Sequence, residues 1–391
     1  MICSGLDVSS SSFLDVEYDK SITSVLKTEA FGGDVYLAPG FIDLQVNGFA
    51  GVDYNSALTP AEEIARSIHA LFASGVTRFY PTVITGAPDD MTGALRNLAR
   101  AKEALAEGAA IEGFHVEGPH ISPEDGPRGA HPLRWVRPPD LNEYRRWQDA
   151  TGGQIRLVTL SPHWPDAPKY IEAVAQDGVT VSIGHTDASE QQISDAVSAG
   201  ATMSTHLGNG AHQVLRRHPN YIWDQLAEDR LTAGFIVDGI HLPASFLRVA
   251  LRAKGVERSV LVTDASTPAG ASPGRYKLGE QEVDLTADQR VVLAGTDRLA
   301  GSALRMHHGI ENLINIARLT LRDAVQMATM NPARIGKIPN RQNGLIAGDR
   351  ADFVVFRYDE EAKRIEVQAT YVDGERVARS VPAASSSSTR Q

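Results

Sequence analysis

The feature that most restricts the fold of this chain is a repeat of short apolar segments with helical patterns between them. Eight segments rich in β-branched and aromatic residues occur, at 41–47, 77–84, 111–117, 155–161, 179–185, 201–207, 232–238 and 259–265. Helical patterns over 59–74, 88–108, 188–200 and 242–255 begin at capping residues or prolines. Such alternation is typical of βαβ units and a parallel sheet. Eight units predict an α/β fold, a (β/α)₈ TIM-like barrel over residues 41–340.

A doubly wound open sheet is the alternative architecture. It commonly carries a glycine-rich dinucleotide-binding turn after its first strand. No such turn follows any of the eight segments. The barrel is therefore the favoured prediction.

The two ends of the chain have a different pattern. Residues 13–29 and 352–377 alternate apolar and polar side chains, which is typical of antiparallel hairpins. We expect the two ends, 1–40 and 341–380, to meet in a small β-sandwich domain beside the barrel. A further hairpin, over 275–295, is inserted after the eighth barrel segment.

Composition narrows the classes of partner. The net charge is −10 and no long basic run occurs, which argues against nucleic acid or an anionic membrane as the main partner. No apolar stretch approaches the roughly 20 residues of a membrane helix, and no signal-peptide pattern opens the chain. We expect a cytoplasmic protein without an internal disulfide, since Cys3 is the only cysteine, and a disordered serine-rich tail over 381–391.

Polar side chains stand at the carboxyl ends of the predicted strands, where barrel enzymes place their catalytic groups. A lone histidine at a strand end is more often structural, but a whole set in one register favours a functional site. The set consists of Gln45 and Asn47, Glu117, His185, His206, His241 and Asp264.

Glu117, His185 and His206 are a plausible set of metal ligands. A catalytic Zn²⁺ uses about three N or O ligands and lowers the pKa of water to roughly 7. A nearby carboxylate can then move the proton to a leaving group, and Asp264 is the candidate. Fe²⁺, Co²⁺ or Mn²⁺ could use the same donors. No role is assigned to His115, His163, His212 and His218.

Taken together, the ordered motifs resemble those of N-acetylglucosamine-6-phosphate deacetylases of the amidohydrolase superfamily. The similarity covers about residues 35–375 and rests on six stretches: "APGFIDLQVNG", "HVEGPH", "IGHTDA", "STHLGN", "DGIHLP" and "VTDASTPAG". It implies a metal-dependent deacetylase that hydrolyses the acetamide of N-acetylglucosamine 6-phosphate to glucosamine 6-phosphate and acetate.

The resemblance also implies roles for single residues. Glu117, His185 and His206 match metal ligands, and Asp264 matches the catalytic acid and base. His131, in "RGAHP", matches a histidine that polarises the substrate carbonyl.

Four further positions match the substrate side of the family's site. Asn209 and the Gly210 backbone match groups that hold the sugar phosphate, and His241 matches another sugar or phosphate contact. Arg217 matches a phosphate-binding arginine that reaches the site of a neighbouring subunit. The resemblance therefore implies a homodimer.

The stretch "HLGNGAH" departs from the family, which usually has His-Leu-aromatic-Asn-Ala-Met there. Gly208 removes a bulky side chain, Gly210 replaces alanine, and His212 adds a polar group. His163 and His218 stand where acids are common. These changes concern substrate contacts rather than the metal ligands.

Two alternatives to the deacetylase hypothesis have their own discriminating features. An amidohydrolase acting on another N-acetylated sugar or an N-acyl amino acid keeps Asp264 but has no need of Arg217. A catalytically silent binding protein predicts loss of a ligand or of the acid/base, yet all four positions are filled.

The first barrel segment predicts how many metal ions bind. Many amidohydrolases carry His-x-His there and bind a second ion, whereas this chain has Gln45-x-Asn47 and no lysine at the end of the fourth segment. Neutral amides are poor zinc ligands beside imidazoles. We therefore expect one metal ion, with Gln45 and Asn47 hydrogen-bonded to water or to neighbouring ligands.

Overall fold

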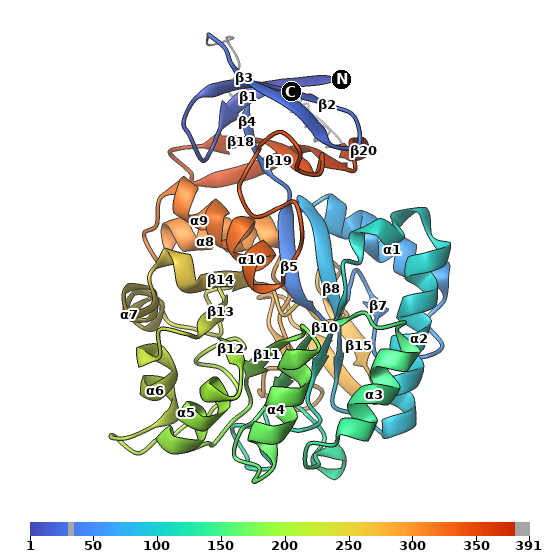
Figure 1. Cartoon of the computed structure of the whole chain (residues 1–391), viewed down its shortest axis with the longest axis vertical. Coiled ribbons are helices and arrows are strands. Elements are labelled where there is room, and N and C mark those ends of the chain that lie inside the picture. The colour runs from blue at the N-terminus through green and yellow to red at the C-terminus, as the bar shows by residue number, and fades with distance from the viewer. Residues whose placement is uncertain (30–34, 380–391) are drawn as a thin grey trace, which may run out of the picture.

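The computed structural model describes residues 1–29 and 35–379. It shows a barrel wrapped in helices, with a separate sheet above it (Figure 1). The tail predicted to be disordered, 381–391, lies outside the described residues. Along the described part of the chain, no helix combines the length and apolar character needed to cross a bilayer.

All eight predicted barrel strands are present. They are β5 (Phe41–Val46), β8 (Val76–Ile84), β9 (Phe114–Glu117), β10 (Ile155–Leu160), β11 (Thr180–Ile183), β12 (Ala201–Ser204), β13 (Thr232–Ile236) and β14 (Ser259–Val262). Neighbours pair in parallel from β5 to β14, and a bridge between Val46 and Ala265 links the two edges. The barrel prediction is confirmed. β9 begins three residues later than predicted, since Ile111 makes only an isolated bridge to Phe79.

Helices cover the outside of the barrel (Figure 1). They are α1 (Ala61–Phe72), α2 (Pro88–Ala104), α3 (Leu141–Ala150), α4 (Ala167–Gln176), α5 (Glu190–Ser198), α6 (Tyr221–Ala227), α7 (Ala244–Lys254) and α8 (Met306–Asn315), followed by α9 (Leu321–Met327) and α10 (Met330–Ile335). Local sequence sets several starts: Ser189 and Gln192 form a capping box on α5, and Asn220 caps α6.

The separate sheet is built from both ends of the chain, as predicted. Its seven strands run in the order β20-β19-β18-β4-β1-β2-β3. Their bounds are β1 (Ile2–Asp7), β2 (Phe13–Tyr18), β3 (Ile22–Lys27), β4 (Tyr36–Pro39), β18 (Phe353–Asp359), β19 (Arg364–Val372) and β20 (Glu375–Arg379). The sheet folds over on itself, because the Tyr18 ring of β2 lies 5.7 Å from the Tyr371 ring of β19. The domain boundaries at 40 and 341 remain a proposal.

Buried ion pairs join the sheet to the lower end of the barrel. Asp352, which is fully buried, accepts from Arg78 at 2.7 Å and also from Arg341. Burial alone would raise the pKa of Asp352, but the two arginines lower it to about 2. The carboxylate therefore stays charged, and the pairing fixes the small sheet against β8.

The predicted insertion forms an antiparallel sheet of its own, β15 (Gly274–Leu278), β16 (Gln281–Leu285) and β17 (Val291–Leu293). It is tied to the barrel through Asp53 of β7 (Val52–Asp53), which accepts from the Gly279 amide at 2.7 Å. This contact holds the insertion over the carboxyl ends of the strands.

Candidate active site

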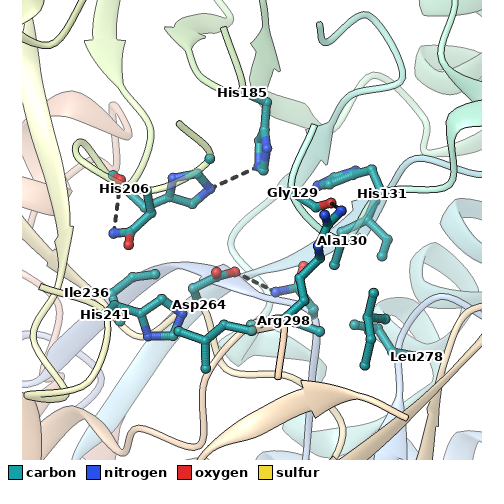
Figure 2. Close-up of a pocket in the computed structure, with 18 of the residues that line it drawn as sticks. Gly129, Ala130, His131, His185, His206, Ile236, His241, Asp264, Leu278 and Arg298 are labelled. Carbon is teal, nitrogen blue, oxygen red and sulfur yellow. Dashed lines mark hydrogen bonds between the residues drawn. The ribbon is translucent and has the colours of Figure 1, made fainter. Parts of the chain in front are cut away.

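Three metal-ligating side chains converge at the carboxyl end of the barrel. The Glu117 Oε1 atom lies 3.0 Å from His206 Nε2 and 3.3 Å from His185 Nε2, and the two Nε2 atoms are 3.0 Å apart. All three residues are buried, and Figure 2 shows the two imidazoles turned toward each other. Within residues 1–29 and 35–379, this is the one group of three or more His, Cys, Asp or Glu side chains whose donor atoms come together in this way.

The chemistry of this donor set fits a divalent cation. His185 Nδ1 lies 2.8 Å from the Pro127 carbonyl, to which only a protonated nitrogen can donate. The Nε2 atom of His185 faces the cluster while Nδ1 contacts a backbone carbonyl, the arrangement that is common for metal-binding histidines. One carboxylate and two imidazoles also match the ligands of catalytic zinc sites.

The cluster keeps Glu117 in its charged form. Burial would raise the pKa of Glu117, but hydrogen bonds with His185 and His206 lower it well below its usual value. Burial likewise disfavours the charged form of His206, yet the hydrogen bond and charge of Glu117 raise the pKa of His206 above its usual value. A carboxylate stripped of water in this way is well suited to bind a cation.

The Asp264 carboxyl group lies beside the triad formed by Glu117, His185 and His206. It accepts from Asn47 Nδ2 at 2.7 Å and from Gln45 Nε2 at 3.0 Å, and the same Gln45 nitrogen donates to Glu117 at 2.8 Å. Gln45 and Asn47 thus make the hydrogen bonds to neighbouring groups expected of them. Burial and then the charge of Glu117 raise the pKa of Asp264 to about 6, which is a suitable range for proton transfer near neutral pH.

A shared backbone turn aims three of these side chains inward. His185, His206 and Asp264 each stand two residues past the end of a strand, with φ of 50°, 29° and 49°. Left-handed backbone is uncommon for residues other than glycine and costs on the order of 1–3 kcal/mol each. Strain repeated at three strand ends is typical of a functional site.

His131 lies in the loop after β9, next to the triad (Figure 2). Its ring centroid is 4.4 Å from that of His185, and its Nδ1 atom is 2.8 Å from Thr85 Oγ1. Burial and then the neighbouring His185 lower the pKa of His131 to about 3. The imidazole is therefore neutral and can donate one N–H.

These groups open onto a cavity of about 970 Å³. Its lining includes every predicted metal, catalytic and first-strand residue except Gln45, together with Asn209, Gly210 and His241. His241 is oriented by Asp238, whose Oδ2 lies 2.6 Å from His241 Nδ1. Sequence reasoning missed Asp238 and Thr85: both lie at predicted strand ends, but the sequence does not show which side chain each of them contacts.

Of the predicted substrate-binding residues, Arg217 alone lies away from the cavity of its own chain. It is exposed on the loop before α6 and does not line the cavity. The insertion and the segment directly after it supply a wall that sequence reasoning did not foresee. Its lining residues include Leu278, Gln281, Arg290 and Arg298.

The four histidines without a predicted role are now placed. His115 is fully buried, with Nε2 2.8 Å from Thr159 Oγ1, and burial lowers its pKa to about 4. His163 Nδ1 lies 2.6 Å from Ser161 Oγ, and His212 Nδ1 lies 3.0 Å from the Tyr221 hydroxyl. His218 is exposed. None of the four lines the cavity.

The glycines of "HLGNGAH" allow close packing around the triad. Gly210 has a φ of 54°, and a Cβ atom there would lie 2.7 Å from His185 Nδ1. A Cβ atom at Gly208 would meet the Phe246 ring at 2.7 Å, so an aromatic side chain from α7 occupies the space beside this loop. The loop can press against His185 only because position 210 has no side chain.

Gly210→Ala is expected to weaken metal binding by about 10- to 100-fold, the usual cost of disturbing a group that orients a ligand. The new methyl group would displace His185 Nδ1 from the Pro127 carbonyl. Competition with a fluorescent chelator measures the affinity. Gly178→Ala is the matched control, since it has positive φ but open space around it. Equal affinities in the two variants would contradict the packing argument.

Comparison with known proteins agrees with this geometry. The family described as "Amidohydrolase family" matches residues 36–377. The N-acetylglucosamine-6-phosphate deacetylase of Bacillus subtilis is 34% identical over 329 residues, which cover 83% of this chain and 82% of that protein. The human protein of the same name is 35% identical over 355 residues, covering 88% of this chain and 84% of its own.

A solved structure is similar over nearly the whole fold. It is a variant of N-acetyl-D-glucosamine-6-phosphate deacetylase from Mycobacterium smegmatis in complex with N-acetyl-D-glucosamine-6-phosphate. The TM-score is 0.84 at 32% sequence identity, and the alignment covers 94% of each chain. The likeness therefore includes both the barrel and the sheet formed by the chain ends.

Proposed function

Because this chain belongs to the amidohydrolase family, and within it to the N-acetylglucosamine-6-phosphate deacetylases, we propose that it hydrolyses the acetamide of N-acetylglucosamine 6-phosphate to glucosamine 6-phosphate and acetate. The observation that carries the proposal is the convergence of Glu117, His185 and His206 beside Asp264 in one cavity. A chain that had kept only the fold would not need this buried, strained cluster.

One divalent ion, most simply Zn²⁺, would be held by Glu117, His185 and His206. Such an ion supplies Lewis-acid chemistry, since it polarises a carbonyl group and lowers the pKa of water. Gln45 and Asn47 donate hydrogen bonds to the carboxylates of Glu117 and Asp264. Because these two amides are already engaged, the arrangement supports a single ion per site. Fe²⁺, Co²⁺ or Mn²⁺ would suit the same donors.

The residues around the triad polarise the acetamide and transfer the proton. His131 is neutral and donates an N–H to the acetamide oxygen, where negative charge develops. Asp264 takes a proton from the attacking water and passes it to the nitrogen as the carbon–nitrogen bond breaks. Asn47 and Gln45 hold Asp264 Oδ1, so Oδ2 is left for this transfer.

The sugar would be bound by Asn209, the Gly210 backbone and His241, which line the cavity beyond the triad. Arg217 is exposed and lies outside the cavity of its own chain. A phosphate contact from Arg217 would therefore be made in the cavity of a second subunit, and we propose a homodimer on this basis.

Assaying acetate release from a panel of N-acetylated sugars tests the function. We expect the highest kcat/KM for N-acetylglucosamine 6-phosphate, with activity lost on chelation and restored by added metal. N-acetylglucosamine without phosphate and N-acetyl amino acids serve as comparison substrates. A higher kcat/KM for an unphosphorylated sugar or an N-acyl amino acid would replace the proposed substrate with that compound class.

A further inference from the structure

The loop that carries His131 is closed by a contact between its two ends. It leaves the barrel after β9 and returns before α3, and the Arg137 N–H donates to the Pro119 carbonyl at 3.1 Å. Inside the loop, the Arg128 guanidinium donates to the His131 carbonyl at 2.9 Å. These contacts shape the loop, but neither of them attaches it to the barrel.

The Arg137 side chain attaches the returning end of this loop to α3. Its Nε and Nη2 atoms donate to the two carboxylate oxygens of Glu143, at 2.9 and 2.6 Å. Glu143 lies in the first turn of α3 and is buried, and the Arg137 side chain is only 22% exposed. Two parallel N–H···O bonds fix the orientation of a guanidinium as well as its distance.

The other donors of Arg137 hold the segment that follows β8. Nη1 donates to the Gly86 carbonyl at 3.0 Å and to the Trp135 carbonyl at 2.6 Å, and Nη2 also contacts Met91 Sδ at 3.6 Å. A guanidinium has five N–H groups, so all of them are engaged within the protein. Arg137 therefore acts by connecting parts of the chain and not by binding a ligand.

The parts that Arg137 connects meet at the hydrogen bond between His131 and Thr85. Thr85 directly precedes Gly86, and its Oγ1 atom lies 2.8 Å from His131 Nδ1. Arg137 thus holds both the loop with His131 and the segment with Thr85. Since Nδ1 faces Thr85, Nε2 is the ring nitrogen left for the acetamide oxygen, and its position depends on both attachments.

We propose that Arg137 is a positioning residue that fixes the His131 imidazole for catalysis through Glu143 and Gly86. This rests on the proposed function, which makes His131 the donor to the acetamide oxygen. Arg137 does not line the cavity, so it acts only through His131. Negative charge develops on that oxygen in the transition state, and a displaced donor should therefore lower kcat more than it raises KM.

Arg137→Lys is expected to lower kcat for N-acetylglucosamine 6-phosphate about 10- to 100-fold, the usual cost of a misplacement near 1 Å. A lysine keeps the charge but cannot make the paired bonds to Glu143 while it also holds Gly86. KM should stay within about threefold, because binding of the ground state does not use the displaced N–H. Metal content should be unchanged. Steady-state kinetics and metal analysis of the same sample measure these quantities.

A double-mutant cycle with His131→Ala shows whether Arg137 acts through His131. If it does, Arg137→Lys should cost less than about threefold in kcat once the imidazole is gone. An equal loss of kcat in both backgrounds would overturn the proposal. So would a lower melting temperature with unchanged kcat per folded molecule, which is what a purely structural role predicts.

Arg78→Lys is the matched control. Arg78 is also buried and makes paired bonds to one carboxylate, donating to Asp352 at 2.7 and 3.0 Å, but it lies at the lower end of the barrel. The same substitution there should lower the melting temperature and leave kcat within about threefold.

Glu143→Gln repeats the test from the other partner and decides it if Arg137→Lys fails to fold. Glutamine keeps the size of the side chain and one acceptor oxygen, so one of the two bonds to Arg137 is lost. We expect kcat to fall about 3- to 10-fold with His131 present, and no further fall in the His131→Ala background. Wild-type kcat in Glu143→Gln would contradict the positioning role.

Failure of the proposed function would give a different result. If the wild-type enzyme releases acetate from the sugar phosphate but the cycle shows no coupling, the role of Arg137 is wrong and the function stands. If the wild-type enzyme hydrolyses another N-acyl compound instead, the substrate is wrong, and the same cycle on that compound tests Arg137.

Discussion

Asp264→Asn is expected to lower kcat for acetate release by about 10³-fold or more, with little change in metal content. An asparagine keeps the shape of the side chain and can still accept from Asn47 and Gln45 through its amide oxygen. It cannot take up and return a proton. The loss should therefore fall on the chemical step and leave KM nearly unchanged, which steady-state kinetics with metal analysis of the same sample measures.

Asp43→Asn is the matched control for this loss. Asp43 is also fully buried in the barrel, but its carboxylate accepts from Thr263 and it does not line the cavity. We expect kcat per folded, metal-loaded molecule to change by less than about tenfold in this variant. Turnover of Asp264→Asn near the wild-type level would show that another group transfers the proton.

The carboxyl-end residues could be predicted to converge without any structure. Strands of a parallel barrel end on the same side, so the barrel assignment implies that Glu117, His185, His206 and Asp264 lie at one end of the barrel. Residues such as Asp238 and Thr85 were missed because their role depends on which side chain they contact. The pairs Asp238–His241 and Thr85–His131 come from loop geometry, which alternation of strands and helices does not specify.

The strained backbone at the site could not be predicted from the sequence either. Nothing in the residue types of His185, His206 or Asp264 indicates a positive φ, since left-handed backbone usually signals glycine or asparagine. The positive φ is set by the tertiary structure around each strand end and not by the residue type.

The position of the insertion also could not be predicted from the sequence, because it depends on contacts between distant parts of the chain. Its hairpin over 275–295 was predicted, yet its position over the cavity depends on the contact between Asp53 and the Gly279 amide, 226 residues apart in the chain. Arg298 then meets Asp125 across 173 residues. Contacts of this range are set by tertiary packing, and local patterns give no signal for them.

Glu117→Gln is expected to reduce bound metal from one ion per chain to a trace, and activity with it. Glu117 is the single carboxylate among the three donors, and it is held in its charged form by His185 and His206. An amide has no charge to offset the cost of stripping water from the cation. Affinity should fall by more than the roughly 100-fold that loss of an outer hydrogen-bond partner costs. Elemental analysis after desalting, with activity before and after metal is added back, measures both quantities.

Glu112→Gln is the matched control for this variant. Glu112 lies at the opposite end of the barrel, where it pairs with Arg350 at 2.6 Å, so metal content should stay at one ion per chain. A Glu117→Gln protein that keeps a full ion and full turnover would contradict the assignment of the ligand. Two tightly bound ions in the wild-type protein would contradict the role of the first strand, because Gln45 and Asn47 would then have to serve a second ion instead of donating to Glu117 and Asp264.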